Sequence, residues 1–464
     1  MSVAMNDPNN QIPMKIEERA LERASFCRYL MAAAEHEEAQ FHMPGHRGGS
    51  VYPEILRENI LSLDMTELPI TEDLNDPGEV LREVQHAWAN VLGAEDLLFL
   101  TGGSSSGIKA GLYALAGFKG QVIALTPVHK AFFQAASLLD LTTLYLPQDE
   151  AEARERLEQA PKDFDPNVLY ITSPDYFGAV LDLPKWLELV RSYYPEIKLM
   201  VDEAHGARFT WLEHIPRALE MGATLAIQSA HKSLPALTPT ALALTADASL
   251  VERLLEGVQL FGTSSAPLAM AAALDYALSY MDTTGEAELK RIRELFAELF
   301  DTLQAHKIYP YREALVSSSV KPLVQDPTRA VLDVTHIGSA YDAEAFLRQR
   351  GIAVEMVDPG RLLLLSYIGQ PQEEFTQLIH ALIDWTLSTP PALDQAAYKN
   401  YRQALARGYF PDTHGYAPHA QGVHLNHPHK KALIPYPPGL GLYAPGETAD
   451  PDLLEQLRAA GIHF

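Results

Sequence analysis

The chain has 464 residues, of which 47% are hydrophobic and 21% charged, values typical of a globular protein with a large core. The 36 Lys and Arg residues against 60 Asp and Glu residues give a formal net charge of −24, which argues against nucleic acid as a partner. Cys27 is the only cysteine, which excludes an intrachain disulfide and a multi-thiolate zinc site and predicts a cytoplasmic protein.

The first residues are polar, and a helical pattern follows over residues 15–38. A glycine-rich turn comes next, over residues 41–49. The polar start does not resemble a signal peptide, and no stretch of the chain is apolar over the length of a membrane span. We therefore expect no membrane partner.

Between about residues 79 and 250, helical patterns alternate with short apolar runs. Helices are predicted over 79–92 and 107–117. Strands are predicted at 96–100, 122–125, 142–146, 168–171, 198–201 and 225–228. This alternation predicts βαβ units and a mainly parallel central sheet with helices on both faces. In such sheets the ligand-binding groups follow the carboxyl ends of the strands.

After about residue 305 the pattern changes to a smaller α+β lobe. Strands are predicted at 329–334, 353–357 and 362–366, and helices at 343–350 and 375–387. A loop-dominated region rich in Pro, Gly and His follows over 408–447. The predicted division is an N-terminal segment over 1–55, a large domain over 56–305 and a small domain over 306–464.

The strongest chemical signal is the run Ser229-Ala-His-Lys-Ser233, directly after the predicted strand 225–228. Lys232 is either an ordinary exposed loop lysine or a buried amine that forms a Schiff base with a carbonyl cofactor. Burial lowers the pKa of an amine and makes it a better nucleophile.

Asp202 follows another predicted strand, 198–201. At that place an aspartate caps a helix, binds a metal ion or pairs with a protonated ring nitrogen of a cofactor, which keeps the ring an electron sink. The distance from Asp202 to Lys232 along the chain corresponds to one βα unit, which places both residues above neighbouring strands.

A third signal is the turn Thr101-Gly-Gly-Ser-Ser-Ser-Gly107, between a predicted strand and a helix. Glycines let the backbone approach a ligand, while amides and hydroxyls at the start of a helix favour an anion. The turn lacks the lysine of a nucleotide P-loop and the spacing of a dinucleotide-binding loop.

Together with His129 at the end of another predicted strand, these groups resemble a pyridoxal 5′-phosphate (PLP) site of the aspartate-aminotransferase fold, PLP fold type I. From about residue 24 onward the chain resembles the bacterial ornithine/lysine/arginine decarboxylases, in the short form without a receiver-like N-terminal domain. The resemblance rests on the blocks HMPGHRGG (42–49), DMTELPITEDLNDP (64–77), TGGSSSG (101–107), PVHKAF (127–132), TSPDYFG (172–178), DEAHGARF (202–209), QSAHKSLPALT (228–238) and YPPGLGLYAPGE (436–447).

The resemblance implies roles for the three strand-end residues. Lys232 is similar to the lysine that binds the cofactor, and Asp202 to the partner of the pyridine nitrogen. His129 is similar to the histidine that stacks on the ring, and its alternative is a helix cap or a core histidine. With the cofactor bound, Lys232 or His129 is the candidate donor of a proton to Cα.

The resemblance also implies a phosphate site and a second ring face. Family members usually have threonine where Gly103 stands, so one hydroxyl is missing here. Ala204 is expected on the ring face opposite His129. The residues implied for the phosphate are Gly103, Ser104, Ser105, Ser229 and His231.

In the family, a cluster of Thr and Ser crosses from the neighbouring subunit to the phosphate. Thr263, Ser264 and Ser265 occupy that place here, unless they form an ordinary polar loop. The resemblance therefore implies a homodimer or a higher homo-oligomer with shared active sites.

The implied reaction is decarboxylation of arginine, lysine or ornithine to CO2 and a polyamine-type amine. Glu355 and Glu447 are candidate partners for a cationic substrate tail, as is Asp358. Lys431 stands about where many family members have an acid, and it faces either the pocket or solvent. A lysine in the pocket would repel a cationic tail.

Two alternatives remain beside this reading. One is a PLP enzyme of the same fold that performs elimination, cyclisation, transamination or oxidation on an amino acid. The other is a non-catalytic relative, against which the joint presence of Lys232, Asp202 and His129 argues. The scattered histidines of the region 414–429 are not expected to bind a metal.

Overall fold

The computed structural model describes residues 21, 23–34, 39–68, 70–313, 321–408 and 416–417. Residues 1–39 and 40–464 form two separate compact units. The first contains helix α2 (Ser25–Ala34), within the helix predicted over 15–38. The predicted boundaries at residues 55 and 305 stay predictions. None of the helices in the described part of the chain is long and apolar enough to cross a bilayer.

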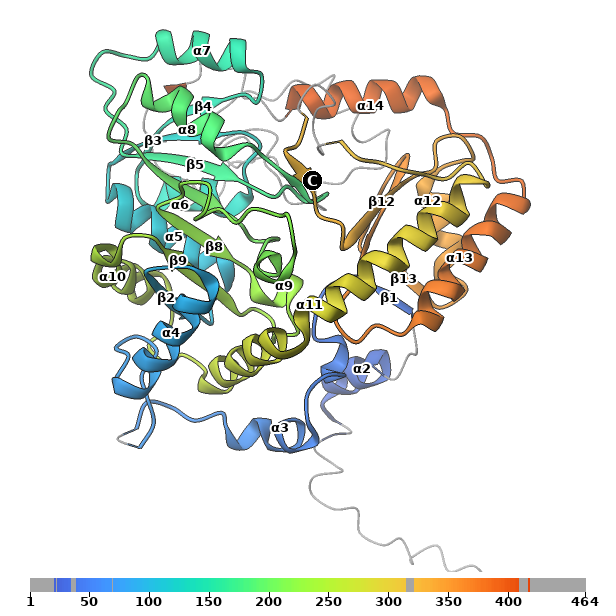
Figure 1. Ribbon diagram of the computed structural model, residues 1–464, viewed down its shortest axis with the longest axis horizontal. Helices are drawn as coiled ribbons and strands as arrows, with labels where there is room; N and C mark the ends of the chain where they lie inside the picture. The colour runs from blue at the N-terminus through green and yellow to red at the C-terminus, as the bar shows by residue number, and fades with distance from the viewer. Residues whose placement is uncertain are drawn as a thin grey trace, which may run out of the picture. The chain divides into compact units, whose positions relative to one another are not determined.

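An eight-stranded sheet forms the centre of the second unit, with the strand order β16-β4-β3-β5-β7-β8-β9-β2 (Figure 1). The strands are β2 (Asp96–Leu100), β3 (Gln121–Leu125), β4 (Thr142–Leu146), β5 (Val168–Thr172), β7 (Lys198–Asp202), β8 (Leu225–Gln228), β9 (Ala241–Thr245) and β16 (Tyr416–Ala417). The run from β4 to β8 is parallel, which confirms the predicted mainly parallel sheet. Strand β9 was not predicted; it lies between β8 and β2 and is antiparallel to both.

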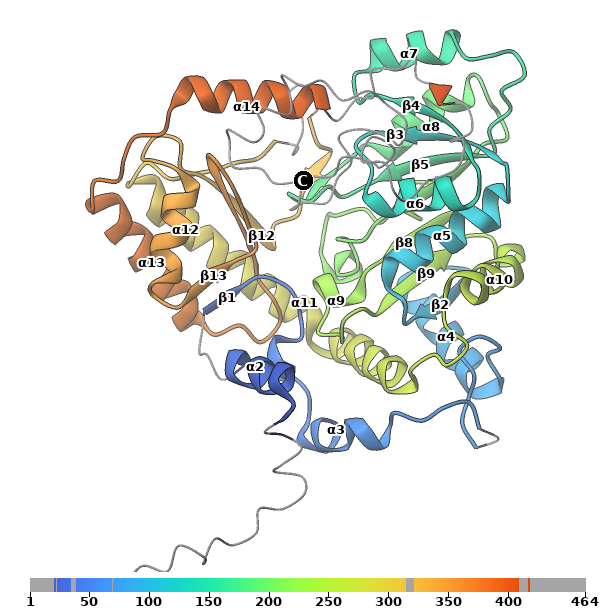
Figure 2. The ribbon, with the colours of Figure 1, turned by 180° about the vertical axis from the view of Figure 1, so that it is seen from behind.

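Helices cover this sheet on both sides: α8 lies in front of it in Figure 1, and α5 and α6 lie in front in Figure 2, the view from behind. The helices of this half are α3 (Glu54–Asn59), α4 (Glu79–Leu92), α5 (Gly103–Ala116), α6 (Lys130–Leu138), α7 (Glu150–Glu158), α8 (Leu183–Arg191), α9 (Ala230–Ser233) and α10 (Val251–Phe261). Short 3-10 turns occur at Arg47–Gly49, Ile60–Ser62, Phe209–Trp211 and Ala248–Leu250.

Two glycines let helix α5 pack directly against side chains of the sheet. A Cβ on Gly111 would stand 2.6 Å from Met200 Cε and 2.7 Å from Leu225 Cδ2. A Cβ on Gly107 would stand 2.6 Å from a methyl group of Leu100. This close packing fixes the N-terminus of α5 directly above the end of β2. The helix begins at Gly103 and not at 107 as predicted, so the glycine and serine turn is its first turn.

The second half contains the smaller α+β lobe. A four-stranded antiparallel sheet has the order β10-β12-β15-β14. Its helix α11 (Leu268–Gln304) runs unbroken for 37 residues and was not predicted. The remaining elements are β1 (Ala39–Phe41), β6 (Ala179–Val180), β10 (Tyr309–Pro310), β11 (Val324–Gln325), β12 (Arg329–Asp333), α12 (Ala340–Arg348), β13 (Ile352–Val354), β14 (Met356–Asp358), β15 (Arg361–Leu365), α13 (Gln372–Leu387) and α14 (Gln395–Gly408).

The prediction of a single strand over 353–357 is wrong in one respect, because this segment contributes to two strands. β13 belongs to a two-stranded sheet and β14 to the four-stranded one, and Glu355 stands between them. The chain changes sheets at this residue, so an unbroken strand cannot form.

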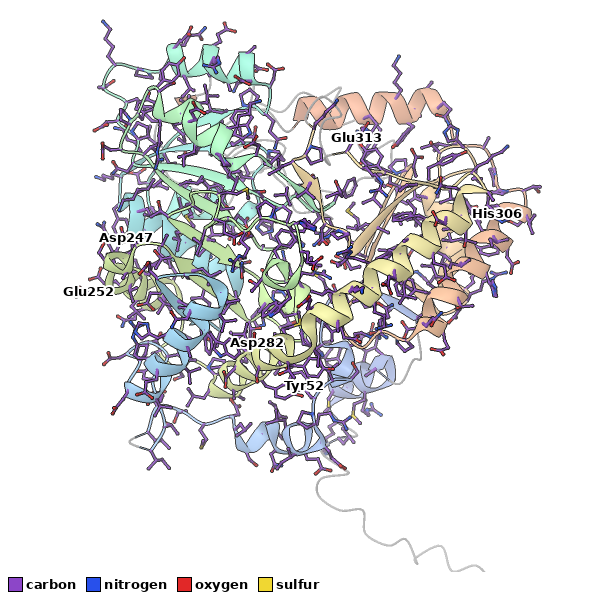
Figure 3. All side chains as sticks on the ribbon, viewed as in Figure 1. Tyr52, Asp247, Glu252, Asp282, His306 and Glu313 are labelled. Carbon is purple, nitrogen blue, oxygen red and sulfur yellow. The ribbon has the colours of Figure 1, made fainter. Side chains whose placement is uncertain are left out.

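The excess of carboxylates is spread over many elements, as the exposed Glu252 of α10 and Asp282 of α11 illustrate (Figure 3).

Candidate functional site

A cavity lies where β5, β7 and β8 end, as expected for a parallel sheet. It is lined by Ser104, His129, Thr172, Tyr176, Asp202, Ala204, His205 and Lys232. The strand register explains why these side chains lie together. Thr172 pairs with Asp202, and Asp202 pairs with Ile227, which comes just before the Lys232 turn. The lining of Ser104, His129, Asp202, Ala204 and Lys232 was predicted from the sequence. Thr172, Tyr176 and His205 were not.

Lys232 lies in the single-turn helix α9, which follows β8 at once. Its Nζ is 3.4 Å from His205 Nε2. Burial lowers the pKa of Lys232, while the negative charges of Asp202 and Glu355 raise it in part. The net lowering increases the fraction of neutral amine, the form that attacks a carbonyl carbon.

The glycine-rich turn of residues 41–49 supports α9 through main-chain atoms. Gly45 N donates to His231 O at 2.9 Å. A Cβ on Gly45 would stand 2.3 Å from Leu234 O, closer than two such atoms can approach. Only glycine fits here, so the turn of the HMPGHRGG block sets the position of the Lys232 helix.

Asp202 is the last residue of β7 and is 2% exposed. Its Oδ2 accepts from the Tyr170 hydroxyl at 3.1 Å, and its Oδ1 accepts from Ala204 N at 3.2 Å. Burial raises the pKa of Asp202, and the cation of Lys232 and these two donors lower it in part. A buried carboxylate that lines the cavity is well suited to pair with a cationic group there.

Tyr170 is a site residue that the sequence reading missed. It lies in β5, fully buried, with its ring 4.7 Å from that of Phe132. Burial, followed by the charge of Asp202, raises the pKa of the Tyr170 hydroxyl, so it stays a hydrogen-bond donor. In the sequence it reads as an ordinary core aromatic, and only the register of β5 with β7 gives its role.

His129 is the N-cap of α6, and its Nδ1 accepts from Ala131 N at 3.2 Å. The two readings of this residue are therefore compatible, since the capping side chain also lines the cavity. Burial and the cations of Lys232 and Lys130 lower the pKa of His129 to about 3, so the ring is neutral. Because Nδ1 is an acceptor, the ring hydrogen belongs on Nε2.

His205 lines the same cavity and was also missed. It is 6% exposed, and its ring meets the Tyr176 ring edge-on at 5.0 Å. Burial and then the charge of Lys232 lower the pKa of His205 well below its ordinary value. The signal that could have identified it was its place in the DEAHGARF block, three residues after Asp202.

The predicted phosphate residues are partly brought together. Ser229 Oγ donates to Ser104 Oγ at 2.7 Å, at the start of α5. Gly103 has a φ of 75°, and a Cβ there would stand 3.1 Å from Pro239 O. Threonine at 103 would therefore be strained, which accounts for the glycine. Of the predicted phosphate residues only Ser104 lines the cavity, and His231 Nδ1 lies 3.0 Å from Thr240 O.

Other predicted residues lie apart from this cavity or outside the described residues. Thr263 and Ser264 are exposed in the connection between α10 and α11, where Asn75 Nδ2 donates to Thr263 O at 3.0 Å. Their contribution to a partner subunit stays a prediction. Lys431, Glu447 and nearly all of the histidine-rich region 414–429 lie outside the described residues.

Glu355 is half-buried and bonded to the cavity wall. Its Oε1 accepts from the hydroxyl of Tyr176, and its Oε2 accepts from Met43 N at 2.9 Å. Its charge acts on Lys232, as the effect on the pKa of that amine shows. Among the predicted tail-binding residues that the structure describes, Glu355 is the one bonded to a residue of the cavity wall.

The donor set of the cavity fits PLP. Lys232 offers a neutral amine to a carbonyl carbon, and Asp202 offers a buried negative charge to a ring nitrogen. Ser104, whose Oγ accepts from Ser229, offers its own hydroxyl to an anion at a helix N-terminus. His129 and Ala204 complete the lining with an aromatic ring and a small side chain.

Comparisons with known proteins agree with this fit. The family model described as Orn/Lys/Arg decarboxylase, major domain, matches residues 24–374. An arginine decarboxylase of Bacillus subtilis (strain 168) is 26% identical over 446 residues, covering 90% of this chain and 89% of the relative. An arginine decarboxylase of Bacillus anthracis is 25% identical over 465 residues, covering 92% and 91%.

Solved structures show the same fold at low identity. Lysine decarboxylase A from Pseudomonas aeruginosa aligns with a TM-score of 0.69 and 18% identity, covering 95% of this chain and 78% of that one. Serine palmitoyltransferase of Sphingomonas wittichii aligns with a TM-score of 0.58 and 13% identity, covering 81% and 99%. The predicted fold class is confirmed. From its sequence match and its fold, the chain belongs to the Orn/Lys/Arg decarboxylase family of PLP-dependent fold type I enzymes.

Proposed function

We propose that the protein releases CO2 from a basic amino acid, with arginine the first substrate to test. The observation that carries the proposal is the placement of two carboxylates about Lys232: Asp202 lines the same cavity, and Glu355 accepts from Tyr176 of the cavity wall. The first suits a cofactor ring and the second a cationic tail. The product is the corresponding polyamine-type amine. The cytoplasm is the proposed location, in keeping with the single Cys27.

In this proposal Lys232 binds the carbonyl carbon of PLP. When bound, the cofactor supplies an electron sink that accepts the electrons left at Cα as CO2 departs. Asp202 holds the proton on the ring nitrogen, and the Tyr170 hydroxyl keeps that carboxylate oriented. Ser104 and Ser229 bind the phosphate, and His129 and Ala204 hold the two ring faces.

A proton has to reach Cα after CO2 has left. His129 and His205 are both neutral because burial lowers their pKa, and a neutral imidazole is a weak acid. The amine of Lys232, with its pKa lowered by burial, is better matched to proton transfer near neutral pH. We therefore propose that Lys232 donates this proton. His205, whose Nε2 is 3.4 Å from the Lys232 Nζ, would orient the amine.

Tail recognition is proposed on Glu355. A carboxylate pairs with a guanidinium through two parallel hydrogen bonds, which favours arginine over an ammonium tail. The names of the relatives in Bacillus species support arginine as well. Lys431 and Glu447 enter no part of this proposal, since they lie outside the described residues.

We also propose a homodimer with shared active sites. Large apolar side chains are exposed along residues 55–70, among them Ile55 at 70%, Leu61 at 85% and Ile70 at 87%. Asn75, a few residues after this segment, donates to Thr263 O and so links the chain beyond the segment to the Thr263 loop. A second copy of the chain would cover the apolar residues and receive Thr263 and Ser264 at its own cavity.

The test is an assay of CO2, ammonia and peroxide released by the purified holoenzyme from arginine, lysine and ornithine. We expect stoichiometric CO2 from at least one of these, with arginine giving the highest kcat/KM. CO2 from none of them, with ammonia or peroxide instead, would favour another PLP reaction. Absence of every product and of cofactor absorbance would favour the non-catalytic alternative.

A further inference from the structure

Both carboxylate oxygens of Glu355 are bonded within the protein. The Tyr176 hydroxyl donates to Oε1, and the main-chain N of Met43 donates to Oε2 at 2.9 Å. The donors come from two distant parts of the chain, the connection between β5 and β6 and the turn after β1. Glu355 itself stands where the chain passes from β13 to β14.

Tyr176 is in turn held in place by its neighbours. Its ring meets His205 edge-on at 5.0 Å, and its main-chain O accepts from Arg329 Nη1 at 3.0 Å. Arg329 is 4% exposed and is fixed by its bond to Asp326 at 3.0 Å. These contacts restrain Tyr176, so its hydroxyl holds the Glu355 carboxylate at the cavity wall.

A carboxylate has about four acceptor positions, two on each oxygen. Among the described residues two donors bond Glu355, one on each oxygen, which leaves one position on each for a ligand. A guanidinium offers two parallel N–H groups to such a pair of oxygens, while a free glutamate side chain would first have to be ordered. Holding the carboxylate in advance removes that entropic cost from binding.

We propose that Tyr176 is a positioning residue for substrate specificity: its hydroxyl holds Glu355 ready to bind the cationic tail. This inference rests on the proposed function and deepens it. It predicts that Tyr176 acts on the recognition of charge in the tail through Glu355. The chemistry at Cα, which depends on Lys232, is left nearly unchanged.

The change Tyr176→Phe removes the hydroxyl and keeps the ring on His205. We expect the KM for arginine to rise about tenfold, the effect of one hydrogen bond to a charged group, with kcat within twofold. Citrulline has the shape of arginine and a neutral tail. The preference for arginine over citrulline should therefore fall by a similar factor.

A double-mutant cycle separates this role from a structural one. Glu355→Gln is combined with Tyr176→Phe, and KM for arginine is measured in all four proteins. If Tyr176 acts through Glu355, the double variant binds arginine no worse than Glu355→Gln alone. The control is Tyr193→Phe, whose hydroxyl bonds Glu158 at 3.4 Å away from the cavity, and whose effect should be within error of zero in both backgrounds.

Calorimetric binding of agmatine, the decarboxylated form of arginine, to the holoenzyme gives a second measurement that needs no turnover. We expect its Kd to rise about tenfold in Tyr176→Phe and to show the same non-additivity. Additive effects, or an equal fall in kcat with citrulline and arginine, would overturn the proposal. An inactive wild type refutes the proposed function instead, and agmatine binding then still decides whether Tyr176 acts through Glu355.

Discussion

Replacing Tyr170 by Phe tests how the Tyr170 hydroxyl supports Asp202 in the proposed cofactor site. The change removes one hydroxyl, which donates to Asp202 Oδ2 at 3.1 Å, and keeps the buried ring beside Phe132. The carboxylate oxygen then loses a donor on a side chain that is only 2% exposed. Such a loss costs about 1–3 kcal/mol of unfolding free energy.

The pH dependence has a definite sign. Burial raises the pKa of Asp202 above its ordinary value of 3.8, so the folded protein holds this proton more tightly than the unfolded chain. Ionisation therefore reduces stability as the pH rises, and more so without the hydroxyl that favours the ionised form. The deficit of Tyr170→Phe relative to wild type should grow from below pH 3.8 toward neutrality.

Urea unfolding of the cofactor-free protein at several pH values measures this deficit. In the holoenzyme, the acid limb of the kcat profile should move to higher pH, because Asp202 is protonated more readily. Tyr52→Phe is the matched control, since that buried hydroxyl donates at 3.1 Å to the neutral Ala273 O. A constant deficit across the pH range, or an equal profile shift in Tyr52→Phe, would refute the reasoning.

Three further changes test the remaining parts of the site. Lys232→Ala should abolish cofactor absorbance and turnover, and a borohydride-trapped adduct on another lysine, found by peptide mass spectrometry, would contradict the assignment. Asp202→Asn should retain the cofactor and lose about 10³-fold in kcat, or roughly 4 kcal/mol, whereas near-normal turnover would exclude its role at the ring nitrogen. Gly45→Ala places a Cβ 2.3 Å from Leu234 O, so we expect the free energy of unfolding in urea to fall by about 1–3 kcal/mol and cofactor binding to slow. Wild-type values for both would show that the turn shifts to make room for the methyl group.

The sequence predicted the polar ends of the strands well and their surroundings poorly. Lys232 and Asp202 were found because a charged residue directly after a buried strand is unusual, and β4 and β8 have the predicted bounds. β9 was missed, although it fixes the far side of the Lys232 turn. The connection from β8 to β9 contains only the four-residue helix α9, so no full crossover helix marks β9 as a separate strand.

Tyr170 and Tyr176 show a different limit. Neither the position nor the residue type separates them from core aromatics, and their roles depend on partners 32 and 179 residues away. Such pairings follow from strand register and from the meeting of two lobes. Glu355 was named from its charge alone, and its bonds to Met43 and Tyr176 required the structure.

The turn of residues 41–49 takes part in the site almost entirely through its peptide groups. Met43 N reaches Glu355, and Gly45 N reaches His231 O. An alanine scan leaves the amide of Met43 intact and would score that residue as dispensable. Methods that alter the backbone itself, such as a proline at 43 or an ester in place of an amide, are needed to detect what this turn contributes. Engineering libraries that vary side chains alone would miss the contribution of the Met43 amide.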